Sequence, residues 1–234
     1  LEKSCPFFKI KNMKILHVGF SDSKGGAAIA MMRLHSALID QNIDSKVLVM
    51  EKNTNDKNVF GPQKSFDVVL NDIKQIITRS KKYFFFNSGG YSHSLNVFNS
   101  NILKRIDEIN PDIVNLHWVN NELLSIKQIG KIKKPAVWTL VDMWPMCGGE
   151  HYTESSRYKN GYLKANKDID NRLIDLNKIL WRRKIKNWNN KFKSIICISD
   201  WLTNKASESV IFKNTNIKKI NCNSNTRDWT PINK

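Results

Sequence analysis

The chain has 234 residues, of which 41% are hydrophobic, enough to bury one good-sized core in a single large domain or two small ones. It carries 38 Lys and Arg residues against 21 Asp and Glu residues, a net charge of +17. No apolar run reaches the roughly 18 residues of a bilayer-spanning helix, which excludes a transmembrane protein. The four cysteines are scattered without a C-x-x-C pair, which favours reduced cytoplasmic thiols over a disulfide or zinc framework.

The positive charge favours an anionic partner: nucleic acid, an acidic membrane surface or a phosphorylated substrate. The alternative is a lysine-rich composition without functional meaning, since Asn and Ile are also abundant. No zinc motif, helix-turn-helix signature or aromatic RNA-binding motif accompanies the charge, so we expect no nucleic-acid partner.

Residues 1–12 resemble no secretory signal, because their apolar patch is short and interrupted. Met13 followed by "KILHVGF" is typical of a natural start. We therefore expect residues 1–12 to be a leader or upstream read-through, and residues 13–234 to form the folded domain.

Short apolar segments alternate with helical periodicity along most of the chain, in an order that predicts one domain. Strands are expected at 14–20, 46–50, 112–118, 135–140, 194–199 and 217–222. Helices are expected at 27–41, 65–80, 102–110, 122–130, 171–190 and 200–209. The alternation predicts right-handed βαβ units and an α/β, doubly wound, Rossmann-like parallel sheet. The region 51–100 is the hardest to interpret and holds an aromatic, Gly- and Ser-rich loop at 83–94.

Ligands of such sheets bind beyond the carboxyl ends of the strands, where strand order reverses. Gly25 and Gly26 lie at the turn from the first strand into the first helix. Without Cβ atoms they let a ligand approach the backbone, and the helix N-terminus offers free N–H groups to an anion. A simple turn is the alternative, because the spacing is neither G-x-G-x-x-G nor that of a Walker loop.

The stretch "VWTLVDMWPMCGG" begins as a buried strand and continues as a restrained loop. The carboxylate of Asp142 could accept hydrogen bonds from a sugar hydroxyl or hold a neighbouring loop. Trp144 offers a flat face to a sugar ring, and Pro145 with Gly148 and Gly149 fixes the path of the loop. The structural alternative is a capping aspartate over a packed tryptophan. His117, beside Trp118 at the end of its own strand, is by itself more typical of a packed core histidine.

The segment 172–193 is the most basic, with eight Lys or Arg residues against one Asp. Ile174, Trp181, Ile185, Trp188 and Phe192 follow one helical stripe, which predicts a core-facing side and a solvated basic face. A sharper hypothesis is that the basic face contacts anionic lipid or a phosphate-bearing acceptor.

Several long segments, taken together and in order, resemble the N-terminal half of a bacterial family-four glycosyltransferase of the polysaccharide or colanic-acid type, with the two-domain GT-B fold. They are "GGAAIAMMRLHSALIDQNIDSKVLV", "NPDIVNLHWVNNELLS", "KPAVWTLVDMWPMCGGEHYT", "LWRRKIKNW", "ISDWLTNKASESVIF" and the tail "INCNSNTRDWTP". The resemblance covers about Met13 to Pro231 and is weakest at 51–100.

The resemblance implies transfer of a sugar from a nucleotide-sugar donor to a surface polysaccharide or lipid-linked glycan, with retention of configuration. It implies no metal and no cofactor beyond the donor as co-substrate. The expected location is the cytoplasm, with peripheral contact to an anionic membrane at its inner face. The N-terminal half would bind the acceptor, while the donor nucleotide is held by a C-terminal domain that is absent here. The 234 residues alone are therefore expected to be inactive.

By position, Gly25 and Gly26 correspond to the family's glycine loop near the donor diphosphate. Asp142 takes the catalytic position of the cleft loop. The acceptor-side positions of the motifs are His117, Trp118, Met143, Trp144, Pro145, Gly148, Gly149 and His151.

Two positions depart from the family pattern. Val141 replaces the histidine that normally precedes the aspartate, and valine can neither donate a hydrogen bond nor carry a proton. Glu150 stands where a cysteine is common. Val141, together with the absent C-terminal half, favours the alternative of a degenerate, non-catalytic module that binds a glycan or a membrane surface.

Overall fold

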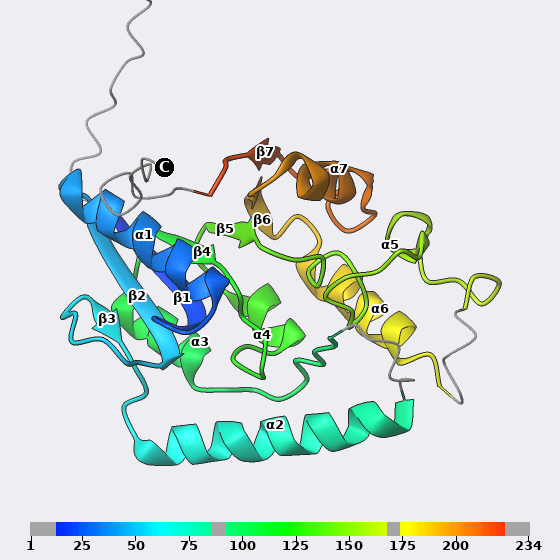
Figure 1. Ribbon diagram of the computed structural model, residues 1–234, viewed down its shortest axis with the longest axis horizontal. Helices are drawn as coiled ribbons and strands as arrows, with labels where there is room; N and C mark the ends of the chain where they lie inside the picture. Colours follow the sequence, from blue (N-terminus) through cyan, green and yellow to red (C-terminus); the bar gives the residue numbers. More distant parts are fainter. Residues whose placement is uncertain (1–12, 86–91, 168–173, 223–234) are drawn as a thin grey trace, which may run out of the picture.

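The computed structural model describes residues 13–85, 92–167 and 174–222. The expected leader, residues 86–91 of the aromatic loop and the tail beyond residue 222 lie outside these ranges. Within them the chain forms one seven-stranded sheet in which every pairing is parallel, with the strand order β3-β2-β1-β4-β5-β6-β7. The expected doubly wound, Rossmann-like α/β sheet is confirmed (Figure 1).

The expected strands all form, with changes at their ends. The strands are β1 (Lys14–Ser21), β2 (Asp44–Glu51), β3 (Val59–Phe60), β4 (Ile113–Leu116), β5 (Ala136–Leu140), β6 (Phe192–Cys197) and β7 (Ile217–Lys219). The two-residue β3 was not anticipated, because two residues are too few for a period-2 pattern. β4 ends before His117, so this histidine and Trp118 lie just beyond the strand.

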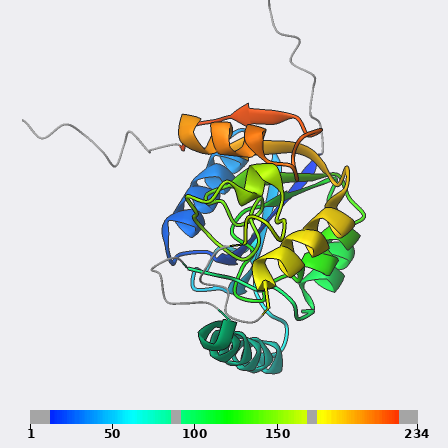
Figure 2. The same ribbon diagram turned by 90° about the vertical axis from the view of Figure 1, so that its right-hand side faces the viewer.

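The helices are α1 (Gly26–Asp40), α2 (Ser65–Phe85), α3 (Ile102–Ile109), α4 (Ile126–Lys131), α5 (Arg157–Asn160), α6 (Leu176–Trp188) and α7 (Asp200–Glu208). α1 lies on the opposite face of the sheet from α4 and α6 (Figure 2). A small cluster around Met31 and Val49 fills the α1 side, while the large core fills the other. This two-sided burial explains the continuous apolar run from Val47 to Met50 in β2.

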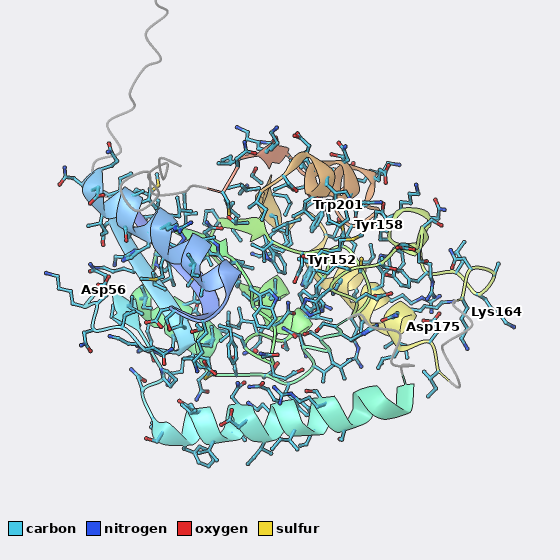
Figure 3. All side chains as sticks on the ribbon, viewed as in Figure 1. Asp56, Tyr152, Tyr158, Lys164, Asp175 and Trp201 are labelled. Carbon is cyan, nitrogen blue, oxygen red and sulfur yellow. The ribbon has the colours of Figure 1, made fainter. Side chains whose placement is uncertain are left out.

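Among the described residues α6 begins at Leu176, and residues 171–173 of the helix expected at 171–190 lie outside the described ranges. Asp175, labelled in Figure 3, caps the helix by accepting a hydrogen bond from the Lys178 amide at 2.9 Å, and it also pairs with the buried guanidinium of Arg157. The expected stripe is only partly buried: Trp188 and Phe192 belong to the core. Ile174 and Ile185 are exposed, which contradicts that part of the prediction. The buried positions of α6 are Asn177, Leu180, Lys184 and Trp188.

Two glycines mark where the backbones of neighbouring segments touch. A Cβ atom on Gly130 would stand 2.4 Å from the Asn187 carbonyl oxygen, and one on Gly148 would stand 2.5 Å from the Asn177 carbonyl oxygen. Both neighbours belong to α6, so α4 and the loop after β5 approach that helix more closely than any larger residue permits.

We therefore expect Gly130→Ala to lower the free energy of unfolding by about 1–3 kcal/mol, because the added methyl group meets backbone that cannot move aside cheaply. Urea denaturation followed by circular dichroism measures the change. Gly26→Ala is the matched control, since nothing lies within 4 Å of its Cβ position and it should leave the stability equal or slightly higher. Equal stability of the two variants would contradict the close approach.

Candidate functional site

A cavity of about 360 Å³ opens at the carboxyl ends of β1 and β4. These strands are neighbours, and the chain moves away from β1 in both directions, to β2 on one side and later to β4 on the other. Strand order reverses at this point, which is where open α/β sheets bind ligands. The cavity wall includes Ser21, Lys24, Gly25, Glu51, His117 and Trp118.

The glycine turn supplies one wall of the cavity. Gly25 is the residue before α1 and has φ 86°, a conformation that other residues rarely adopt. It caps the helix without a side chain, so the N–H groups of the first turn remain available to an anion. The Ser21 hydroxyl accepts the Lys24 amide at 3.2 Å and shapes the turn, and the Lys24 ammonium lies 3.0 Å from Glu51. Gly26 is the exposed first residue of the helix but does not line the cavity.

A pair of buried, neutral histidines joins β1 to the residue that follows β4. His17 Nδ1 and His117 Nε2 are 3.0 Å apart, and both side chains are buried. Burial, with a further contribution from His35, lowers the pKa of His17 to about 3. Burial and the neighbouring His17 hold the pKa of His117 well below its ordinary value. His117 lines the cavity, and among the described residues its Nδ1 has no hydrogen-bond partner.

Asp142 connects the second wall to the loop after β5. One carboxylate oxygen accepts the Trp144 amide at 3.0 Å, and the other accepts Trp118 Nε1 at 3.1 Å and contacts His151 Nδ1 at 2.6 Å. Asp142 itself is buried and does not line the cavity. It therefore contacts the cavity wall through Trp118, and its expected catalytic role stays a prediction.

Ser94, His151 and Asp142 are spaced like a nucleophile, base and orienting acid. Ser94 Oγ lies 2.8 Å from His151 Nε2, and His151 Nδ1 lies 2.6 Å from Asp142. All three are buried, and the cavity that Ser94 lines holds only about 10 Å³, room for a single water at most. A substrate cannot reach the hydroxyl, so the arrangement ties the segment around Ser94 to the loop after β5.

The loop from Met143 to Gly149 is buried throughout, which corrects its assignment to the acceptor surface. Trp144 is fully buried, donates its Nε1 hydrogen to the Ser94 carbonyl at 2.9 Å and packs 6.1 Å from Trp138. It cannot stack on a sugar in this structure, so the structural alternative is correct for this ring. The other residues withdrawn from the acceptor surface for the same reason are Met143, Pro145, Gly148, Gly149 and His151.

Lys184 of α6 binds the carbonyl groups of the loop from Met143 to Gly149. Its ammonium is fully buried and donates to the carbonyl oxygens of Cys147 at 3.0 Å, Gly148 at 2.7 Å and Trp144, and it lies 3.7 Å from the centre of the Trp144 ring. Burial lowers its pKa to about 7, against the opposing effect of Cys147 and Glu150. The expected solvated basic face of the helix therefore loses one of its charges to the core.

The sequence analysis did not anticipate the structural roles of two acidic residues. Glu150 is buried, accepts a hydrogen bond from the Tyr162 hydroxyl at 3.2 Å, and has a pKa raised by burial. Glu122, in the loop after β4, accepts three backbone amides at 96–98, at 2.8 to 2.9 Å. Asn121 and Glu122 both adopt left-handed backbone conformations, with φ 55° and 58°. No local pattern announces these roles, because each depends on a partner distant in sequence.

Among the described residues, no three His, Cys, Asp or Glu side chains are grouped to hold a metal ion. In the same part of the chain, no helix has the length and apolar character needed to cross a membrane.

No protein-family profile matches the sequence, and no curated protein matches it significantly. The solved structures to which the chain is similar, at low sequence identity, include three proteins bound to UDP or UDP-glucose. HepE from Anabaena in complex with UDP has 12% identity and a TM-score of 0.41, with 92% of this chain and 45% of that chain covered. UGT71G1 from Medicago truncatula, complexed with UDP-glucose, has 10% identity and a TM-score of 0.42, with 90% and 52% covered.

A ugt transferase from Siraitia grosvenorii in complex with UDP has 9% identity and a TM-score of 0.35, with 87% of this chain and 47% of that chain covered. The chain thus spans about half the length of the solved structures that it matches.

The buried histidines predict a loss of stability in acid. The pKa of His17 in the folded chain, about 3, lies below its ordinary value of 6.5, so the unfolded chain binds the proton more tightly between these values. Stability is fully present above pH 6.5 and falls with pH, by about 2 kcal/mol at pH 5 from His17 alone. Urea denaturation at pH 7.5 and pH 5 measures the loss. His17→Gln should lose less over this interval, and an identical loss would contradict the assignment.

We expect substitution of the buried Lys184 to reduce the stability of the fold strongly. Lys184→Met leaves three buried carbonyl groups without their donor, and we expect the free energy of unfolding to fall by about 3 kcal/mol. Lys186→Met, on the exposed side of the same helix, should change it by less than about 0.5 kcal/mol. Denaturation curves of both variants at pH 7 test the difference, and an unchanged Lys184→Met midpoint would show that the contacts contribute nothing.

Proposed function

We propose that the chain is the N-terminal, acceptor-side domain of a glycosyltransferase with the GT-B fold, acting with a nucleotide-sugar donor. The observation that carries the proposal is the cavity at the strand-order reversal between β1 and β4. It combines a glycine turn and a helix N-terminus with a buried histidine whose Nδ1 is unsatisfied. An anionic group with adjacent hydroxyls, such as a sugar diphosphate, matches that combination of donors and acceptors.

Each wall of the cavity would have a different role. The backbone at Gly25 and Gly26, with the Lys24 ammonium, would receive the donor diphosphate at the N-terminus of α1. Trp118, half-buried and fixed through its indole N–H by Asp142, would present its ring to a sugar, and His117 Nδ1 would exchange a hydrogen bond with a hydroxyl. These roles concern orientation and binding, which precede any bond-forming step.

The mechanism, the acceptor and the location of the enzyme are also proposed. The resemblance supports a retaining transfer without a metal, to a polysaccharide or a lipid-linked glycan, at the cytoplasmic face of a membrane. It places the nucleotide of the donor mainly in a C-terminal half, so these 234 residues should bind the donor weakly and should not transfer sugar alone.

One observation favours a second candidate, a non-catalytic module that binds a glycan or a membrane surface. Val141 is half-buried, where the family resembled has a histidine near the transferred sugar. A valine there offers no proton and no hydrogen bond to the reaction. Such a module would keep the cavity and its ligand without catalysing transfer.

Titration of the ¹⁵N-labelled chain with UDP, GDP and pyrophosphate, followed by NMR, tests the cavity. We expect amide shifts at residues 24–28 and 117–118. Gly26→Asp should weaken binding at least tenfold, because its carboxylate would repel a phosphate from the first turn of α1. Ser65→Asp, which adds the same charge at the first residue of α2, is the matched control and should bind as the parent does. Absence of binding, or equal weakening by both variants, would contradict the proposal.

A further inference from the structure

Helix α2 presents its apolar side to the outside and its polar side to the protein. Phe66, Val69, Ile73 and Ile76 have relative exposures of 68%, 54%, 48% and 64%. In contrast, Asn71, Gln75 and Thr78 on the other side are buried. A surface helix of a globular protein normally has the reverse arrangement. The views in Figures 1 and 2 show α2 as a separate layer at the edge of the molecule.

Polar contacts hold α2 in this orientation. The Lys74 ammonium donates to the Asn99 carbonyl oxygen at 2.7 Å, and the Asn101 amide donates to the Asp67 carboxylate at 2.7 Å. The Thr78 hydroxyl donates to the backbone carbonyl oxygens of Lys74 and Gln75 within the same helix. Rolling the helix to bury its apolar side would break the contacts with the segment 99–101. The exposed face is therefore built into the fold.

The exposed residues form a continuous stripe. Phe66, Val69, Ile73 and Ile76 are spaced three or four residues apart and so lie on one side of the helix, flanked by the exposed Ile77. At 1.5 Å per residue, the stripe is about 15 Å long. Contiguous apolar surface of this kind marks a docking site far more often than isolated exposed residues do.

The charge around α2 favours an anionic partner. Between Lys64 and Lys82 the sequence has five basic residues against two acidic ones. The cavity that Phe66 lines also has Lys64, Lys104 and Arg105 in its wall. Glu108 pairs with Lys104 and Arg105, so of these three described residues it is Lys64 that carries an unpaired positive charge. Asp72 is exposed and opposes this charge only in part. A second copy of the chain is disfavoured, because two bodies of net charge +17 repel each other.

We propose that α2 is an interfacial membrane helix, which inserts its stripe at the boundary between headgroups and acyl chains of an anionic bilayer. Apolar residues on one side, basic residues around them and a helix of 21 residues are the features of such elements. The proposal moves the membrane contact expected for the basic helix 171–190 to α2.

The position of α2 connects the membrane to the cavity. Gln75, Thr78 and Arg79 of α2 line a small cavity with Asn121, and Asn121 also lines the 360 Å³ cavity between β1 and β4. A bilayer under α2 would therefore lie beside the entrance to the candidate site, as a lipid-linked acceptor requires. This last step rests on the proposed function, whereas membrane binding by α2 does not.

Co-sedimentation with vesicles tests the helix. The purified chain is mixed with vesicles of phosphatidylcholine alone or with about 30% phosphatidylglycerol. We expect binding to the anionic vesicles and a loss of at least tenfold in the partition coefficient for Ile73→Gln/Ile76→Gln. Both positions are exposed, so the fold should survive, which circular dichroism checks. The matched control is Ile179→Gln/Ile185→Gln on α6, which should bind within twofold of the parent.

Three results would overturn the proposal: no binding to anionic vesicles, an equal loss in both double variants, or binding lost only in the α6 variant. A dimer in size-exclusion chromatography that the α2 substitutions dissociate would also overturn it, and would assign the stripe to self-association. Nucleotide titration of the same α2 variant separates the two proposals, because lipid binding can fail while the shifts at residues 24–28 persist.

Discussion

The buried carboxylate of Asp142 is the interaction on which the candidate site depends. Its two oxygens contact an indole from the segment after β4, and a backbone amide and an imidazole from its own loop after β5. A carboxylate without these donors could not be buried at so little cost. The orientation of Trp118, and through it one wall of the cavity, therefore depends on a residue that does not line the cavity.

The residues that line the cavity and the residues that hold them in place belong to different parts of the chain; we call the second group the framework. The glycine turn, His117 and Trp118 face the cavity, while the loop from Asp142 to His151 lies behind them. Ser94 and Glu122 extend the framework to the segment 94–98, which passes between α2 and that loop. Backbone conformations that disfavour side chains, at Asn121 and Glu122, occur where framework and surface meet.

The order of elements was predictable from the sequence, because apolar runs and helical periodicity are local properties. The turn at Gly25 was predictable too, since a glycine between a strand and a helix can adopt the positive φ that this turn has. Trp144 was misinterpreted because an aromatic residue after a strand can face either a ligand or the core, and only its distant partners Ser94 and Lys184 decide. The inward face of α2 was equally hidden, since helical periodicity does not say which side a helix turns toward the protein.

The contacts of Lys184 determine how the loop from Met143 to Gly149 responds to the salt concentration. Three peptide oxygens converge on one ammonium group, as ligand oxygens converge on a potassium ion. The cation here is covalently attached to the chain, so it cannot be exchanged for sodium, removed by a chelator or diluted away. The loop should keep its shape from low to high ionic strength, whereas the exposed pair of Lys24 and Glu51 at the mouth of the cavity weakens as salt is added.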